Sequence, residues 1–199
     1  SKPAQGWSDI THTAKLTATG SVSRDHVGWS VAIAADTVAV GACDADHGGI
    51  TDTGAVHVFA SQGAAWTDPA HVGTLGASDA ASGDFLGRAV AIDRDAIVAG
   101  ASAADTSIIT DAGAAYLFLK PTSGWRSLTE TAKLTTADPG CQHLGMAVTL
   151  DGQTVFAGAG SSEVNGRPRQ GAVYVFGPAC TPLTAVTITG PSTATTGAE

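Results

Sequence analysis

The sequence predicts an all-β protein made of three copies of one small antiparallel sheet, and three observations carry this prediction. One apolar stretch is written three times, at residues 27–42, 86–101 and 144–159. Within each copy, branched apolar residues alternate with small ones, and a period of two is typical of a β-strand rather than a helix. The 199-residue chain is also rich in glycine (25 residues) and low in charged residues (14%), as expected for short strands joined by turns.

The repeat extends beyond this stretch and divides the chain into units. One tryptophan, one leucine and one phenylalanine of each unit recur at intervals of 58 or 59 residues. Self-similarity at so many positions defines units at residues 1–66, 67–125 and 126–180. The threonine-rich segment 181–199 breaks the repeat and is interpreted as a strand or linker toward another domain or subunit. The recurring residues are Trp7, Trp66, Trp125, Leu16, Leu75, Leu134, Phe59, Phe118 and Phe176.

Each unit predicts four short strands. In the first unit, "AKLTA" (14–18) is the first strand, residues 30–41 are a hairpin that turns at Ala35 and Asp36, and "GAVHVF" (54–59) is the last strand. Both faces of the hairpin are apolar, so both must be covered by neighbouring sheets. Four antiparallel strands that stack on both sides describe one blade of a β-propeller. Three blades do not close a propeller, so we expect the ring to be closed by oligomerisation or by further blades.

Three glycines in each unit are expected to have structural roles. One precedes the hairpin, one ends it and one begins the last strand, where a turn or a close backbone approach requires a residue without a side chain. They are Gly28, Gly41 and Gly54 in the first unit, Gly87, Gly100 and Gly113 in the second, and Gly145, Gly158 and Gly171 in the third.

These recurring residues resemble the FG-GAP repeat family, which forms the blades of integrin α-subunit propellers and of many bacterial surface proteins. The Gly-Ala of the GAP element recurs three times, and the FG element does so with an aliphatic residue in place of phenylalanine. "GAVYVF" at 171–176 matches the family's last strand. The resemblance covers residues 7–178 and implies an extracellular propeller closer to the bacterial form than to integrins. The GAP elements begin at 41, 100 and 158, and the FG elements at 27, 86 and 144.

Calcium is a candidate cofactor, although not at the family's usual place. Integrin-type blades often carry a DxDxDGxxD calcium loop between the FG and GAP elements, and here that span is only a tight turn. The first unit instead places Asp44, Asp46 and Asp52 at positions 1, 3 and 9 of the loop "DADHGGITD". Calcium takes six to eight oxygen ligands, so this loop is a candidate Ca²⁺ site, with Asp105 and Asp111 as a weaker one. A solvated acidic loop is the alternative.

The loops that precede the hairpins are acidic as well. Asp25 and Asp84 recur there, and these loops should share one face of the propeller with the loops after the GAP elements. Such a face suits a cation, a sugar or a basic partner. We therefore take Asp25, Asp84 and the non-recurring Trp29 as candidate ligand contacts. Trp29 is either a core residue private to the first unit or an exposed contact.

Charge and motifs argue against several function classes. The net charge of −8, without a run of lysine or arginine, disfavours nucleic acid and anionic membranes as partners. No apolar stretch approaches the roughly 18 residues of a membrane-spanning helix, so we expect no membrane insertion. The six histidines are scattered, and neither HExxH nor GxSxG occurs, so we expect no enzyme.

The sequence therefore predicts a non-catalytic, secreted or surface-attached propeller module for adhesion or for binding a protein or glycan ligand through an acidic loop face. One alternative is a structural subunit that self-associates through its blade edges and C-terminal segment. Another is an accessory propeller of a larger secreted enzyme. The three cysteines, Cys43, Cys141 and Cys180, allow at most one intrachain disulfide, and their pairing stays open.

Overall fold

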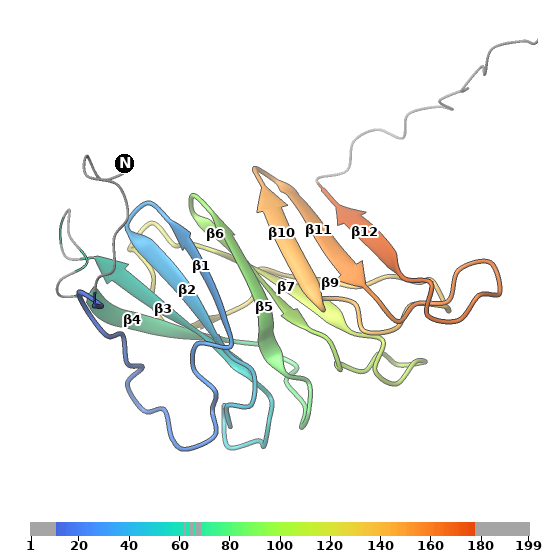
Figure 1. Cartoon of the computed structure of the whole chain (residues 1–199), viewed down its shortest axis with the longest axis horizontal. Coiled ribbons are helices and arrows are strands. Elements are labelled where there is room, and N and C mark those ends of the chain that lie inside the picture. Colours follow the sequence, from blue (N-terminus) through green and yellow to red (C-terminus); the bar gives the residue numbers. More distant parts are fainter. Residues whose placement is uncertain (1–10, 62, 64–65, 67–68, 178–199) are drawn as a thin grey trace, which may run out of the picture.

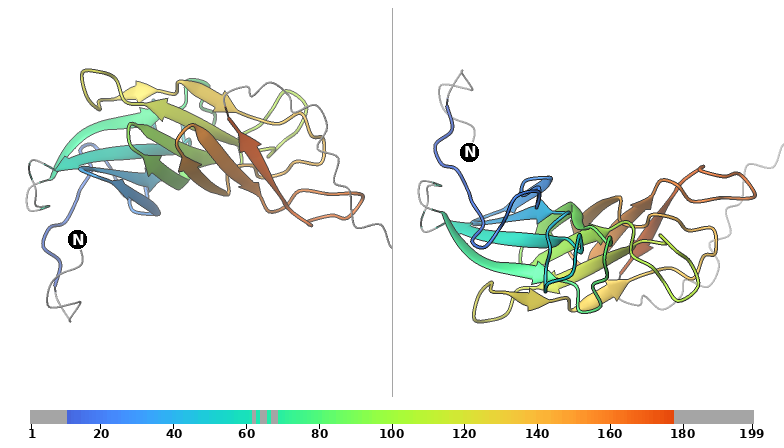
Figure 2. Two further views of the ribbon diagram at one scale, coloured as in Figure 1. Left: turned by 90° about the horizontal axis from the view of Figure 1, so that it is seen from above. Right: turned by 90° about the horizontal axis from the view of Figure 1, so that it is seen from below.

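The structure, a computed structural model, describes residues 11–61, 63, 66 and 69–177. Over this part of the chain all regular elements are β-strands, arranged in three successive sheets, and the predicted fold class is confirmed. The sheets follow one another from β1 to β12 as an open arc (Figure 1) and stack face to face when seen from above or below (Figure 2). The predictions for Trp7, Cys180 and segment 181–199 fall outside the described residues.

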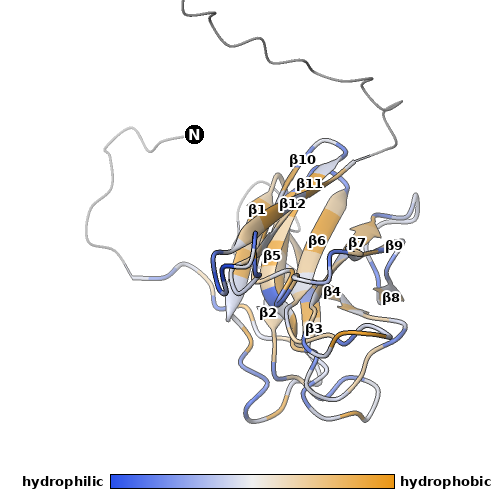
Figure 3. Cartoon of the chain, turned by 90° about the vertical axis from the view of Figure 1, so that its right-hand side faces the viewer, coloured by the Kyte–Doolittle hydropathy of each residue, from blue (hydrophilic) through white to orange (hydrophobic). Residues whose placement is uncertain are grey.

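The first and largest sheet has the strand order β1-β2-β3-β4-β8, the second β5-β6-β7-β9 and the third β10-β11-β12. The predicted hairpins are present in all three, and Ser30, for example, pairs with Gly41 across a tight turn. The strands are largely hydrophobic, whereas hydrophilic residues concentrate in the loops and turns (Figure 3). The bounds are β1 Ser30–Ala34, β2 Thr37–Ala42, β3 Ala55–Ser61, β4 Pro69–Gly76, β5 Leu86–Asp93, β6 Ala96–Ala101, β7 Ala114–Leu119, β8 Leu128–Thr129, β9 Ala132–Leu134, β10 Ala147–Asp151, β11 Thr154–Ala159 and β12 Ala172–Phe176.

In the first and second sheets, the fourth strand comes from the following sequence unit. The sequence placed the leucine-containing strand before the hairpin of its own sheet, and this allocation is wrong. Strand β4, with Leu75, pairs antiparallel with β3 of the preceding unit, and β9, with Leu134, pairs with β7. Residues 14–18, the corresponding segment of the first unit, form no strand. The sheets are therefore offset from the sequence units, and one sheet spans the boundary placed after residue 66.

Apolar side chains fill the two spaces between consecutive sheets. Between the first and second sheets, Leu75, Ile97, Phe118 and Trp125 belong to one buried cluster. Between the second and third sheets, Leu144 and the interior residues of β11 form the next cluster. Removing such side chains from water is the main favourable contribution to stacking the sheets. Leu75 and Phe118 thus pack between the first and second sheets, and Leu134 and Phe176 between the second and third. Leu16 and Phe59 instead belong to a separate cluster with Val38 and Val40 of the first sheet.

Backbone contacts between glycines set how closely the sheets approach. A Cβ atom at Gly41 would collide with the carbonyl oxygen of Gly87, and one at Gly100 would collide with that of Gly145. At both junctions, the glycine that ends the hairpin is therefore in direct backbone contact with the FG glycine of the next unit. Gly158, at the corresponding position of the third unit, has no such neighbour, because an added Cβ would approach nothing closer than 3.6 Å.

We predict that Gly100→Ala destabilises the protein by about 3 kcal/mol or more, because the two backbones must separate to admit a methyl group. Gly158→Ala is the matched control, since it adds the same methyl at the equivalent position where nothing is displaced. Urea unfolding of dilute protein measures both variants. Equal loss of stability in the two would contradict this account of the junction.

Candidate functional site

Six loops emerge at one end of the sheets and together form the loop face, which is defined by residues 19–29, 43–54, 77–85, 102–113, 135–146 and 160–171. This placement follows from the antiparallel strand order, which returns the chain to the same end before each hairpin and after it. In Figure 1 the loops of the first two units lie along the lower edge of the molecule, and the loop between β11 and β12 continues this face at the right. The sequence-based expectation that both sets of loops share a face is therefore met by the strand order.

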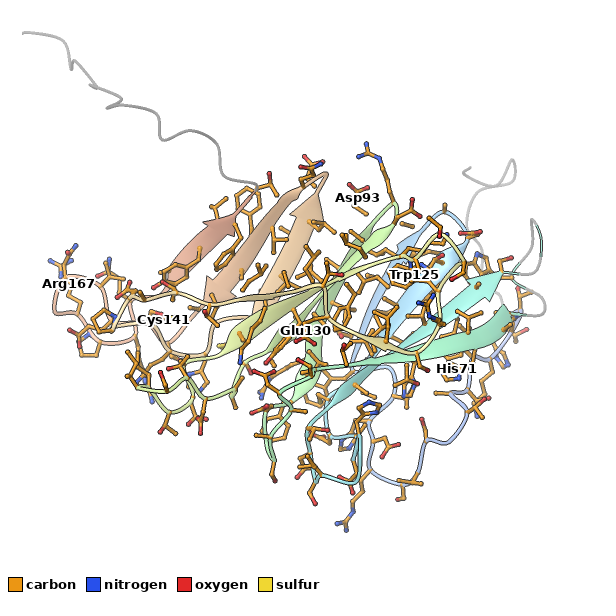
Figure 4. All side chains as sticks on the ribbon, turned by 180° about the vertical axis from the view of Figure 1, so that it is seen from behind. His71, Asp93, Trp125, Glu130, Cys141 and Arg167 are labelled. Atoms are coloured by element: carbon orange, nitrogen blue, oxygen red, sulfur yellow. The ribbon has the colours of Figure 1, made fainter. Side chains whose placement is uncertain are left out.

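The loop face is acidic. Its six loops contain ten aspartate or glutamate residues and three arginines. Two of those arginines, Arg167 and Arg169, belong to the third unit, and Arg167 lies at the far end of that loop in Figure 4. The negative charge is therefore concentrated over the first two units. The ten residues are Asp25, Asp44, Asp46, Asp52, Asp79, Asp84, Asp105, Asp111, Asp138 and Glu163.

Asp25 and Asp84 are buried and hold their own loops in shape. The Asp25 carboxylate accepts a hydrogen bond from the backbone N–H of Val22 at 2.7 Å, and Asp84 accepts one from Ala81 at 2.8 Å. Burial raises the pKa of Asp84 above its ordinary value, against the opposing effect of the Ala81 amide. Both side chains thus occupy equivalent places in the repeat, beneath the surface where a ligand would be contacted.

Two of the candidate calcium residues brace the loops after the GAP elements. Asp46 accepts a hydrogen bond from the backbone N–H of Asp52, and Asp105 accepts one from Asp111, each at 2.9 Å. Asp52 and Asp111 have the same left-handed backbone, with φ of 53°. The same bond in two units indicates that the recurring aspartate closes the loop, as short polar side chains often do.

Asp44, the first candidate ligand of the first loop, forms a hydrogen bond with the imidazole Nδ1 of His26. Asp44 and Asp46 therefore each have a separate protein partner. Within the described ranges, no three His, Cys, Asp or Glu side chains are grouped as a metal site. The calcium site stays a prediction, and an ion would have to draw Asp44 away from His26.

Cys43 and Cys141 are both buried free thiols, so neither is bonded to the other. Burial, together with the neighbouring Asp44, raises the pKa of Cys43 to about 11. A thiol with such a pKa is almost wholly protonated at neutral pH and is a poor nucleophile or metal ligand.

The second and third units carry a recurring tyrosine–aspartate hydrogen bond. Tyr116 of β7 donates to Asp79 at 3.0 Å, and Tyr174 of β12 donates to Asp138 at 2.7 Å. Lys133 also binds Asp79, at 2.6 Å. Although partial burial opposes it, the bonds from Lys133 and Tyr116 hold the pKa of Asp79 below its usual value. In these units the tyrosine, on the third strand of its sheet, is thus hydrogen-bonded to the loop that precedes the hairpin of its own unit.

The first unit lacks this bond and is hollowed at the same place. His57 and Gly20 occupy the positions of the tyrosine and the aspartate. The loops there enclose a polar cavity of about 260 Å³, whose lining includes Gly20, Asp25, Asp46, His47, His57 and Thr74. The smaller imidazole and the absent side chain at position 20 leave the space that Tyr116 and Asp79 fill in the second unit.

His57 and Asp25 are both buried polar residues that line this hollow. The Nδ1 atom of His57 lies 3.2 Å from His71 Nε2 and 3.2 Å from Thr74 Oγ1, and its Nε2 lies 3.3 Å from Ser21 Oγ. Burial, together with the neighbouring His71, lowers the pKa of His57 to about 4. The imidazole is therefore neutral at physiological pH. Sequence reasoning gave His57 no role, although tyrosine at both equivalent positions was a readable sign that the first unit differs.

Trp29, the third candidate ligand contact, is exposed and is not a core residue. More than half of its surface is accessible (54%), and its ring lies 6.1 Å from that of His26. Trp29 stands just before β1, the edge strand opposite β4 and β8, and it does not line the hollow of the first unit. The structure thus separates the three ligand candidates into two buried carboxylates and one edge residue.

Stacked antiparallel sheets with acidic loops at one end define a propeller-type binding module. The FG-GAP repeat model matches residues 10–59 and 69–118, which together make up half of the chain, and the chain belongs to the FG-GAP repeat family. No curated protein matches it. In the described residues no helix is long and apolar enough to cross a membrane.

We predict that the melting temperature falls as the pH is lowered from about 6.5 toward 4. The unfolded chain takes up a proton on His57 near pH 6.5, whereas the folded chain resists protonation until about pH 4. The stability that the neutral imidazole contributes is therefore complete above pH 6.5 and decreases below it. Calorimetry should show that, over this pH range, the melting temperature of the natural sequence falls by roughly 5 °C more than that of the His57→Gln variant. Parallel curves for the two proteins would contradict the buried neutral state.

We predict that Ca²⁺, if it is a cofactor, binds the loop of Asp44, Asp46 and Asp52 and raises the melting temperature of EDTA-treated protein by about 2–4 °C. Asp44→Asn, which removes a ligand charge and leaves the Asp46 brace intact, should abolish the rise. Mg²⁺ at the same concentration controls for ionic strength. A melting temperature that neither EDTA nor Ca²⁺ changes would rule out this site.

Proposed function

We propose that this protein is a non-catalytic extracellular module that binds a partner protein through a basic segment, and that the hollow of the first unit is the anchoring site on the loop face. The observation that carries the proposal is the departure of the first unit from its own repeat. Two units close the space under the loop with a tyrosine–aspartate bond, and the first opens it by placing His57 and Gly20 there.

The charge around the hollow supports a cationic ligand. Asp46, which is exposed, lines the hollow, and Asp44 stands two residues before it in the same loop, while the buried histidine of the hollow, His57, is neutral. A lysine or arginine side chain entering here meets carboxylate oxygens at the rim and neutral hydrogen-bonding groups within. Charge-assisted hydrogen bonds of this kind are stronger than neutral ones. The acidic surroundings would also speed the encounter with a basic partner.

Family membership supports an extracellular role, since FG-GAP repeats are typical of extracellular and surface proteins. A binding role without catalysis also agrees with the state of the polar residues. Asp25 and Asp84 are committed to backbone amides, and the pKa of His57 lies well below the value suited to a general base at neutral pH.

The test is binding of a fluorescein-labelled octalysine peptide, followed by fluorescence anisotropy. We expect binding that weakens about tenfold between 50 and 300 mM NaCl, because the contact is electrostatic and partly exposed. The double variant Asp44→Asn with Asp46→Asn should bind at least fivefold more weakly. The Asp46→Asn change keeps a side-chain carbonyl oxygen that can accept the bond from the Asp52 amide, so the loop should keep its shape.

The matched control removes the same two charges from the opposite end of the sheets, with Asp95→Asn and Asp151→Asn. This variant should bind octalysine as the natural sequence does. Labelled octaglutamate should not bind to any of the proteins. Equal weakening by both double variants would show a response to net charge only and would overturn the assignment of the hollow.

A further inference from the structure

The two junctions inside the chain share one backbone connection. The residue before each FG glycine donates its N–H across the junction, from Leu86 to the carbonyl of Thr53 and from Leu144 to that of Ala112, each at 2.9 Å. The glycine that follows then lies against the glycine that ends the preceding hairpin. Because both junctions repeat these contacts, they define what a next unit needs in order to dock.

The third sheet presents the acceptor half of such a junction with nothing bound. Gln170, which corresponds to Thr53 and Ala112, has a carbonyl that accepts no hydrogen bond within the described part of the chain. The residue before it, Arg169, has φ of 57°, close to the 53° of Asp52 and Asp111. Gly158 and Gly171 are not approached by a neighbouring unit. The acceptor loop thus already has the conformation of an occupied junction.

The face and the outer edge of the third sheet are open as well. Val173 is 66% exposed, whereas its counterpart Val56 is fully buried, and Val175 and Phe156 are exposed on the same sheet. Strand β12 pairs only with β11 among the described strands, whereas β3 and β7 each pair with an outer strand from the next unit. Among the described residues, the third sheet therefore has neither a covering sheet nor a fourth strand.

An apolar groove marks a third missing element. At the first junction, Trp125 belongs to the buried cluster that contains Val58, Leu75, Ile97 and Phe118. The corresponding residues of the second junction instead line a groove of about 360 Å³. The groove is large enough for an indole. The corresponding residues are Leu117, Leu134, Val155 and Phe176.

The first unit presents the donor half, also preformed. His26, before its FG element, has φ of 51°, and the corresponding Phe85 and His143 have 58° and 60°. The N–H of Val27, the counterpart of the Leu86 donor, has no acceptor among the described residues. Val31 is 61% exposed on β1, so this edge also ends in apolar surface without a cover.

Residues 14–18 already lie where an outer strand would lie. Leu16 packs against the cluster of Val38, Val40 and Phe59. These residues correspond to Ile97, Ala99 and Phe118, which share a cluster with Leu75 of the outer strand β4. Segment 14–18 thus holds the position of an outer strand relative to its own unit and lacks only the sheet to pair with.

We propose that the third sheet of one copy binds the first unit of a second copy, head to tail. The internal pairs Val56–Leu75 and Ala115–Leu134 fix the register, so Val173 pairs with Leu16 of the second copy. Gly28 of the second copy lies on Gly158, and its Val27 N–H binds the Gln170 carbonyl.

A second copy is the occupant that this chain itself fits. The donor and acceptor halves are both preformed, and each has the partner residues that the other lacks. Their charges also agree, because Arg169 would stand beside the loop of Asp25, whereas the internal junction places Asp52 beside that of Asp84. Such contacts are heterologous, and two of them close two arcs into a six-bladed ring, within the usual four to eight blades.

The first experiment measures the mass of the full 199-residue chain in solution by sedimentation equilibrium. We expect a dimer of twice 19.7 kDa. Gly158→Ala should give a monomer of unchanged circular dichroism, because the new methyl blocks the incoming glycine and meets its own chain only at ordinary van der Waals distance, 3.6 Å or more. Gly160→Ser is the matched control and should stay dimeric, since the corresponding residue of the second unit is Ser102. A monomeric natural chain, a ladder of larger species or a dimeric Gly158→Ala variant would overturn the proposal.

The second experiment tests the register by disulfide trapping, in chains that carry Cys180→Ser and keep the buried Cys43 and Cys141. Leu16→Cys chains mixed with Val173→Cys chains should form a cross-linked dimer under mild oxidation. Ala14→Cys chains mixed with Val173→Cys chains are out of register and should cross-link at least tenfold less. Equal yields in the two mixtures would exclude the proposed strand pairing, whatever the mass in solution.

Discussion

The structure depends on the close approach of two glycine backbones at each junction between sheets. Gly41 lies against Gly87 and Gly100 against Gly145, with no room for a side chain between them. This contact fixes the spacing and registration of neighbouring sheets, and the apolar cluster around Leu75 and the other recurring residues can fill the remaining space only at that spacing. The small residues of the repeat are thus as necessary to the core as the large ones.

The three units share this scaffold, and the first unit differs from the other two at the place where they carry the tyrosine–aspartate bond. The tyrosine–aspartate bond of the other two units fastens sheet to loop, and its replacement by His57 and Gly20 exchanges a structural bond for a polar hollow. Loops held by a rigid scaffold are the usual location of binding residues. The loop aspartates Asp25 and Asp46 keep their structural bonds in this unit, so the hollow lies within a loop region that is otherwise held as in the second unit.

Local features of the fold were predictable from the sequence, whereas the pairing of strands that are distant in the sequence was harder to predict. The hairpins and the junction glycines follow from alternation and recurrence, which act over a few residues. The outer strand was assigned to the wrong sheet because alternation identifies a strand but not the strand with which it pairs. The sequence around Leu75 alternates in the same way whether the strand pairs within its own unit or with the preceding one. In the candidate site, the acidity of the loop face was readable. The burial of Asp25 was not, because its partner is a backbone amide, Val22 N–H, that every residue type except proline supplies.

The offset of sheets and sequence units has a mechanical consequence. Because β4 follows the first unit in sequence yet pairs with β3 in the first sheet, the chain crosses each junction twice, once as an outer strand and once as the following hairpin. The second and third units therefore cannot separate from the rest of the protein without removing a strand from the sheet before them. Neighbouring repeats therefore share strands and are not independent units. Unfolding of one unit should disturb its neighbour, and removal of one sequence unit would leave an incomplete sheet.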